Sequence, residues 1–272
     1  MDYTLHQNGW TVIIEDFDLS VASTQELFDL SKLCARYTCI KIRNQNLTMD
    51  QEVRIIKSFK NPYRLFDVSH PKFKEFSLDQ EGYVGRVTAS AIAGHKEEML
   101  WHNEMPAIRT GSDIAWLYAE RGVNGSVTVW NNTVLAYKDL DASVKDRIKN
   151  LKCIYFGNVN HSIARTELNF NNRTIYDQAV PLVHTNCEGE TGLHLSLHQF
   201  EKFEGMNRIE SLAIAEPLFE FVTQDKYCYV HNWQDGDVSM SDQWFGVHKR
   251  LHFEDMADRL VHRATFNYPE II

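Results

Sequence analysis

The sequence has no cluster of basic residues. Its 28 Lys and Arg residues are outnumbered by 37 Asp and Glu residues, which gives a net charge of -9. Such a protein does not attract the phosphate backbone of a nucleic acid, because that attraction needs a positive surface. We therefore expect no nucleic acid partner.

Long apolar runs are also missing. No stretch approaches the roughly eighteen apolar residues that mark a transmembrane helix. Residues 1–10 are polar and lack the basic and then apolar layout of a signal peptide. We expect a cytoplasmic protein with no membrane segment.

Cysteine is scarce, and its five copies are never spaced as a CxxC pair. An odd number of scattered cysteines argues against both a disulfide framework and a zinc ribbon. We expect buried free thiols, as is usual for unpaired cysteine. The five residues are Cys34, Cys39, Cys153, Cys187 and Cys228.

No internal repeat, low-complexity segment or linker divides the chain. Its 272 residues, 43% of them hydrophobic, are enough to bury one full core. We predict a single domain over residues 1–272. Within it, residues 1–81 form a helical and strand cover, and residues 82–272 form a β core with insertions.

Local patterns predict helices first and strands later. Ser23 to Glu26 and Thr48 to Gln51 fit helix capping boxes, and the apolar spacing after each suits an amphipathic helix. A strand is expected between them at 38–42. Short β-rich segments follow at 83–88, 114–119, 127–130, 153–156, 193–197, 227–230 and 264–266, with helical patterns at 134–151 and 209–222. This order predicts a mainly β protein with helical cover (α+β) and a closed or double-sheet core.

A candidate metal site comes from two distant segments. His102 and Glu104 are two residues apart, so on an extended chain their side chains project from the same face. By itself an HxE pair is a weak signal. His248 adds a third donor, and two histidines with one carboxylate leave coordination positions open, as non-haem Fe(II) oxygenases require.

Two arginines follow this histidine. Arg259 and Arg263 lie eleven and fifteen residues after His248. A guanidinium held on a rigid strand offers a planar fork to a carboxylate. One arginine could therefore hold a keto acid that chelates the iron, and the other an anionic substrate.

The ordered set of these residues resembles the taurine/2-oxoglutarate-dependent dioxygenase (TauD/TfdA) family. The resemblance runs from about residue 82 to residue 267. The matching segments read GYVGRVT, LWHNEM, GSVTVW, PLVHTN, NWQDGDVSMSD and RLVHRATF. The site residues that match in order and spacing are His102, Glu104, Thr128, His248, Arg259 and Arg263.

The resemblance implies a fold and a reaction. The fold is a double-stranded β-helix, or jelly roll. His102, Glu104 and His248 would bind Fe(II), and Thr128 and Arg259 would bind the distal carboxylate of 2-oxoglutarate. O2 would be the second co-substrate, and succinate and CO2 would be released as the substrate is oxidised.

The resemblance also bears on the substrate. Arg263 matches the position that holds a sulfonate or carboxylate, so a small anionic molecule is expected. Most of the family has Asp where this chain has Glu104, and the His-x-Glu variant resembles clavaminate synthase-like enzymes, which favours a free amino acid. His70 and Glu98 could contact such a substrate from loops. Residues 88–100 are expected to form a mobile lid.

Several other polar residues are expected to be structural. His194 and His198 would lie about 13 Å apart on a strand, too far to hold one ion. His262 should point away from the face that carries Arg263. Asp237 and Asp242 are read as turn residues and as acceptors for the N–H groups of metal-bound histidines.

Three alternatives remain open at this point. The chain could be a catalytically silent jelly roll that binds a ligand, a desaturase or cyclase of the same oxygenase class, or a zinc hydrolase that uses the same triad. The last does not explain Arg259 and Arg263. A homo-oligomer is also left open.

Overall fold

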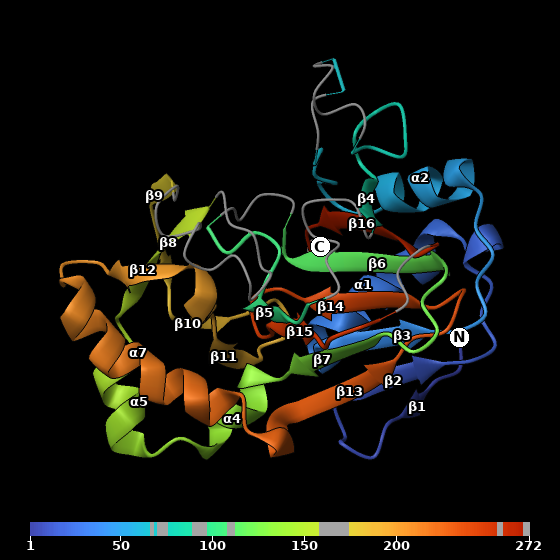
Figure 1. Cartoon of the computed structure of the whole chain (residues 1–272). Coiled ribbons are helices and arrows are strands. Elements are labelled where there is room, and N and C mark those ends of the chain that lie inside the picture. Colours follow the sequence, from blue (N-terminus) through green and yellow to red (C-terminus); the bar gives the residue numbers. More distant parts are fainter. Residues whose placement is uncertain are drawn as a thin grey trace.

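The computed structural model describes residues 1–65, 68–69, 76–88, 97–107, 112–157, 174–254 and 258–268 (Figure 1). Within these residues, the two largest sheets have strand orders β1-β2-β3-β14-β6-β16-β4 and β13-β7-β15-β5. The strands of the seven-stranded sheet are β1 (Thr4–Leu5), β2 (Thr11–Ile14), β3 (Cys39–Ile42), β4 (Gly85–Thr88), β6 (Ile114–Arg121), β14 (Val238–Asp242) and β16 (Leu260–Phe266). Those of the four-stranded sheet are β5 (Met99–His102), β7 (Val127–Asn131), β13 (Cys228–Asn232) and β15 (His248–Arg250).

These two sheets pack face to face and enclose a core. One core cluster takes Cys39 and Val261 from the larger sheet and Trp130 and Tyr229 from the smaller one. The buried ammonium of Lys41 in β3 lies 3.1 Å from the centre of the Trp130 ring in β7, a cation–π contact between the sheets. The prediction of a mainly β fold with helical cover and a jelly-roll core is confirmed.

Two N-terminal helices cover the outer face of the larger sheet. They are α1 (Thr24–Tyr37) and α2 (Met49–Ser58), and both begin at the predicted capping boxes. In α1, for example, the amide of Glu26 donates to the hydroxyl of Ser23, and the amide of Ser23 donates back to the Glu26 carboxylate at 2.9 Å. The N-terminal segment also contributes β1 to β3 to the sheet itself, so it is more than a cover.

An insertion of helices and short strands lies at one end of the sheets (Figure 1). Its helices are α4 (Thr133–Asp139), α5 (Ala142–Ile148) and α7 (Arg208–Val222). Its strands are β8 (Lys152–Gly157), β9 (Thr174–Pro181) and β12 (Phe200–Phe203), which form one sheet, and the hairpin of β10 (Val183–Thr185) and β11 (Thr191–Leu193). Short 3-10 helices lie at Leu19–Val21, Leu197–Gln199 and Asp225–Tyr227.

Two predicted elements were wrong in extent. The helical pattern at 134–151 is two helices, because Leu140 is extended and breaks the run before α5. The predicted strand at 193–197 ends at Leu193, and a 3-10 helix follows from Leu197. Leucines alternate with polar residues at 193–197, and this pattern predicted a strand with one core face and one solvent face. In the structure the residues on both sides of the chain are buried, so the pattern did not indicate a strand.

The structure also describes the cysteines and the lengths of the helices. All five cysteines are free thiols; three are buried and two are partly buried. No helix in the described part of the chain has both the length and the apolar character needed to cross a bilayer.

Candidate active site

Strand pairing brings the two candidate histidines together. In the register of β5 and β15, the Cα atoms of His102 and His248 are direct partners, although they are far apart in the sequence. Their side chains therefore project from the same face of the sheet, and their ring centres lie 4.4 Å apart.

Glu104 completes this cluster just after β5. Its amide donates to the side-chain oxygen of Gln243 at 2.8 Å, and its carboxylate lies 3.5 Å from Nε2 of His248. Candidate ligand atoms of His102, Glu104 and His248 all lie within 4.8 Å of one another. The structure thus assembles the three predicted donors at one point.

The donor set fits a divalent transition metal. Nδ1 of His102 lies 2.6 Å from the carbonyl oxygen of Leu100, so Nδ1 donates and Nε2 is the nitrogen that could bind a metal. Two imidazoles and one carboxylate are the donors that non-haem Fe(II) sites use.

The electrostatics of Glu104 favour its ionised form. Burial alone raises the pKa of this carboxyl, but Arg263 and the two imidazoles outweigh burial and hold the pKa well below its usual value. Arg263, on β16, donates a hydrogen bond to the carboxylate. The sequence did not predict this contact between the expected substrate arginine and the expected metal ligand.

Thr128 and Arg259 lie close to the triad. The hydroxyl of Thr128, on β7, accepts a hydrogen bond from the indole of Trp233 at 2.8 Å, which leaves its own proton available for an acceptor. Arg259 immediately precedes β16 and is 7% exposed. Its Nε and Nη1 atoms are buried and have no hydrogen-bond partner among the described residues, so these donors suit an anion.

The backbone at Gly122 packs closely against the backbone of Asp258 and Arg259. Gly122 has φ of +66°, and a Cβ atom there would lie 2.7 Å from the carbonyl carbon of Asp258. Only glycine fits this point without a shift.

A cavity joins these groups. The residues that line it are Val87, Met99, His102, Glu104, Leu117, Thr128, Trp233, His248, Arg250, Arg259, Val261 and Arg263. All six site residues given by the family resemblance are in this set. Arg250 was missed, although it lies two residues after His248 on a strand and so shares its face.

The other two predicted substrate contacts, His70 and Glu98, are not among the described residues that line the cavity. His70, and most of the expected lid at 88–100, fall outside the described residues. Glu98 forms an ion pair with Lys249 at 3.2 Å and is not among the residues that line the cavity.

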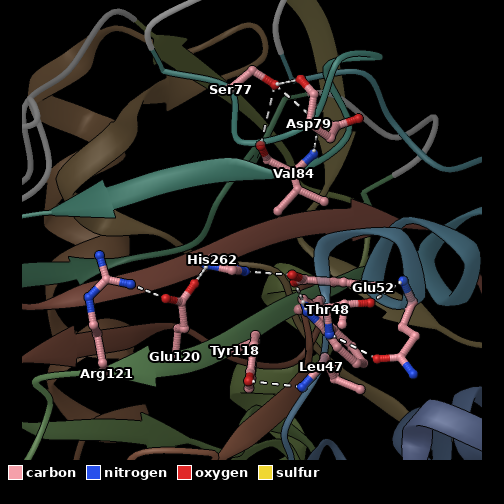
Figure 2. A network of polar contacts seen from close by, with 12 residues as sticks. Leu47, Thr48, Glu52, Ser77, Asp79, Val84, Tyr118, Glu120, Arg121 and His262 are labelled. Carbon is pink, nitrogen blue, oxygen red and sulfur yellow. Dashed lines mark hydrogen bonds and ion pairs between the residues drawn. The ribbon is translucent and has the colours of Figure 1, made fainter.

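His262 has the structural position that the sequence predicted. Figure 2 shows its imidazole between two carboxylates. Nδ1 lies 2.5 Å from Glu52 of α2, and Nε2 lies 2.8 Å from Glu120 of β6. The imidazole of His262, on β16, therefore links helix α2 to strand β6.

Three further polar residues form buried hydrogen bonds away from the candidate metal ligands. His194 is fully buried, with Nε2 2.9 Å from the carbonyl of Pro106. Asp237 accepts from His231 and Arg43, and Asp242 accepts from the amides of the Trp244–Phe245 turn. Neither carboxylate contacts the candidate metal ligands, so the expectation that they accept from metal-bound histidines was wrong.

Comparisons with known proteins found similar sequences and similar structures. Residues 5–265 match the family described as taurine catabolism dioxygenase TauD, TfdA family. The alpha-ketoglutarate-dependent 2,4-dichlorophenoxyacetate dioxygenase of Cupriavidus pinatubonensis (strain JMP 134 / LMG 1197) is 24% identical over 271 residues, covering 93% of this chain and 92% of that protein.

Two solved structures share the fold. The crystal structure of AAD-2 in complex with Mn(II) and N-oxalylglycine has a TM-score of 0.78 at 21% identity and covers 99% of this chain and 98% of that one. A taurine dioxygenase from Burkholderia xenovorans has a TM-score of 0.73 at 22% identity, with 94% of this chain and 85% of that chain covered.

Proposed function

We propose that this chain, which belongs to the taurine catabolism dioxygenase TauD, TfdA family, oxidises a small anionic substrate at a centre formed by His102, Glu104 and His248. The enzyme is an Fe(II)- and 2-oxoglutarate-dependent dioxygenase that uses O2. The observation that carries the assignment of the centre is the convergence of three donor atoms beside the buried guanidinium of Arg259.

Each group has a part in the proposed mechanism. Bound Fe(II) supplies the redox chemistry that couples O2 and 2-oxoglutarate to oxidation of the substrate. Thr128 and Arg259 bind the distal carboxylate of 2-oxoglutarate, and the indole of Trp233 orients the Thr128 hydroxyl. The buried walls of the cavity limit the access of water to the reacting groups.

Arg263 is the proposed contact for the anionic group of the substrate. It lines the cavity, and its side chain is 28% exposed, so a bound molecule can reach it. The named substrates of the relatives, 2,4-dichlorophenoxyacetate and taurine, are small molecules with one acidic group. We favour a free amino acid for this chain because of its His-x-Glu motif.

Turnover assays test the substrate class. Purified protein is supplied with Fe(II), 2-oxoglutarate and O2, and succinate release is measured with amino acids, phenoxyacetates and sulfonates in parallel. We expect stimulation by an amino acid. Stimulation only by another class would overturn the amino-acid assignment and keep the oxygenase. The product mass then separates hydroxylation, which adds oxygen, from desaturation or ring closure, which removes two hydrogens.

A variant tests the co-substrate site. Arg259→Ala removes the proposed partner of the distal carboxylate, and the loss of a charged hydrogen bond of about 1.5–3 kcal/mol should weaken 2-oxoglutarate binding at least tenfold. An unchanged affinity for 2-oxoglutarate would refute the role of Arg259.

The proposal extends to the whole chain. We propose one domain over residues 1–272, because β3 pairs with β14, near the other end of the chain, within the same sheet. A cytoplasmic location is also proposed, since the five free thiols suit a reducing compartment.

A further inference from the structure

Two buried glutamines hold the backbone that carries the candidate ligand Glu104. Gln243, which immediately follows β14, accepts from the amide of Glu104 at 2.8 Å. Gln199, the last residue of a 3-10 helix in the insertion, accepts from the amide of Asn103 at 3.3 Å and from the hydroxyl of Ser196 at 2.5 Å. Two consecutive amides beyond the end of β5 are therefore bound to side chains from two distant parts of the chain.

Gln243 is itself held in one orientation. Its Nε2 donates to the carbonyl of Ser241 at 3.3 Å, and its own amide donates to the carbonyl of Asp113 at 2.8 Å. Its carbonyl accepts from the side-chain amide of Asn103 at 3.2 Å. Because the amide of Glu104 needs an acceptor and the carbonyl of Ser241 needs a donor, the side-chain amide of Gln243 satisfies both in one orientation and neither when it is flipped.

A fixed backbone makes the length of the ligand side chain important. The carboxylate of Glu104 lies 3.5 Å from Nε2 of His248 and accepts a hydrogen bond from Arg263. An aspartate has one C–C bond fewer, so from the same backbone position its carboxylate would end about 1.5 Å short. Metal–ligand distances vary by only about 0.2 Å, so this deficit is too large for a metal site to absorb without a backbone shift.

We propose that Gln243, supported by Gln199, is a positioning residue for Glu104: it holds the backbone where a glutamate reaches the metal and an aspartate does not. This inference rests on the proposed function. The structure thereby gives a physical reason for Glu104 in place of the Asp that most of the family has at this position. The amide group of Gln243 acts through the backbone of Glu104 and is not itself a ligand.

A double-mutant cycle tests the proposal, with Mn(II) affinity measured by calorimetry. In the wild-type background, we expect Glu104→Asp to weaken Mn(II) binding at least tenfold. Gln243→Met removes the acceptor at similar side-chain length and should weaken Mn(II) binding about tenfold, as is typical when a residue that orients a metal ligand is lost. In the Gln243→Met background the backbone can shift, so Glu104→Asp should cost less than threefold more. Equal losses in the two backgrounds, or a loss below threefold in the wild-type background, would overturn the proposal.

Another buried glutamine provides the matched control. Gln45 accepts from the amide of Leu19 at 2.9 Å, as Gln243 does from that of Glu104, but it is not among the residues that line the cavity. Gln45→Met should lower the urea midpoint of unfolding as Gln243→Met does, and its Mn(II) affinity should stay within twofold of wild type. If Gln45→Met weakens Mn(II) binding as much as Gln243→Met, the effect is one of general stability and the proposal fails.

The outcomes separate this inference from the proposed function. If wild-type protein does not bind Mn(II), or if Glu104→Ala binds it as tightly as wild type, the assignment of the metal centre fails. If Mn(II) binding needs Glu104 but the cycle is additive, only the role of Gln243 fails. Should Gln243→Met not fold, or bind Mn(II) too weakly to measure, Gln199→Met releases the neighbouring amide and replaces it in the cycle. The same decrease in the cost of Glu104→Asp is expected there, and an unchanged cost would refute the proposal.

Discussion

Arg263 donates a hydrogen bond to Glu104, so the cation expected to hold the substrate contacts the carboxylate expected to hold the metal. Glu is one methylene longer than Asp, and the additional length helps the carboxylate to contact both His248 and this guanidinium. The contact also explains how a carboxylate in a buried site stays ionised before a metal binds.

This ion pair leads to a prediction for Arg263→Ala. If Arg263 serves the substrate, the variant should bind Mn(II) within about threefold of wild type, because the three ligands remain. Substrate-stimulated succinate release should fall at least tenfold, since a charged hydrogen bond to the substrate is lost. Calorimetry with Mn(II) and a succinate assay measure the two effects. A loss of Mn(II) affinity as large as that in Glu104→Ala would show that Arg263 serves the metal ligand instead.

A second prediction concerns the hydroxyl of Thr128. Thr128→Val keeps the shape of the side chain but removes both the donor to 2-oxoglutarate and the acceptor of the Trp233 indole. We expect 2-oxoglutarate affinity to fall about tenfold and stability to fall by about 1–3 kcal/mol, because a buried N–H is left unpaired. Thr128→Ser retains the hydroxyl, so its 2-oxoglutarate affinity and its stability should both stay near those of wild type. Equal defects in the two variants would point to packing and not to the hydroxyl.

A third prediction concerns the network in Figure 2. Glu52 is fully buried and accepts from His262 and, at 2.9 Å, from the indole of Trp116. Glu52→Gln replaces one acceptor with a donor, so one buried partner loses its bond, and we expect a loss of about 3–5 kcal/mol in the free energy of unfolding. Urea titration measures it.

Glu120 is the matched control for this network. It contacts the other nitrogen of His262, but its side chain is 35% exposed, so water can replace the lost acceptor. Glu120→Gln should cost less than about 1 kcal/mol. If Glu52→Gln and Glu120→Gln lower the free energy of unfolding equally, the burial of Glu52 does not explain the stability that this network provides.

A fourth prediction gives the pH dependence of stability. Burial lowers the pKa of His231 to about 4, although Asp237, 3.0 Å away, partly offsets the effect. In the unfolded chain the pKa is about 6.5, so between pH 6.5 and 4 the unfolded state binds more protons and stability falls as the pH falls. At pH 4 the titration of His231 has lowered the free energy of unfolding by about 3 kcal/mol.

His231→Gln removes this titration. Urea unfolding at several pH values should give a flatter decline for the variant than for wild type between pH 6.5 and 4. Below that window the carboxyl of Asp237, whose pKa is lowered despite its burial, adds its own loss in wild type. Parallel curves across the window would contradict the assignment of His231.

The sequence predicted the features that depend on local patterns or on spacing. The capping boxes at Ser23 and Thr48 start helices because their bonds involve residues only three positions apart. The pairing of His102 with Glu104 needed only the two-residue period of an extended chain. His248 could be added because the family resemblance supplied the long-range register, which a local pattern does not contain.

What the sequence did not predict depends on packing between distant elements. Asp237 was assigned to the metal site by its nearness to His248 in sequence, but the fold places it against His231 and Arg43. His194 alternates with leucines as a strand residue would, yet it is buried against Pro106. Arg250 was overlooked because Lys249 and Arg250 look like an ordinary pair of surface charges until the facing strand is known.

The register that opposes His102 and His248 also has a consequence for synthesis of the protein. A ribosome that has translated only the first of these residues has made an incomplete ligand set, and strand β15 emerges much later. Iron insertion must therefore wait until the partner strand has left the exit tunnel and paired. A nascent chain that stalls before that point would lack the complete centre, and with it the means to activate oxygen there.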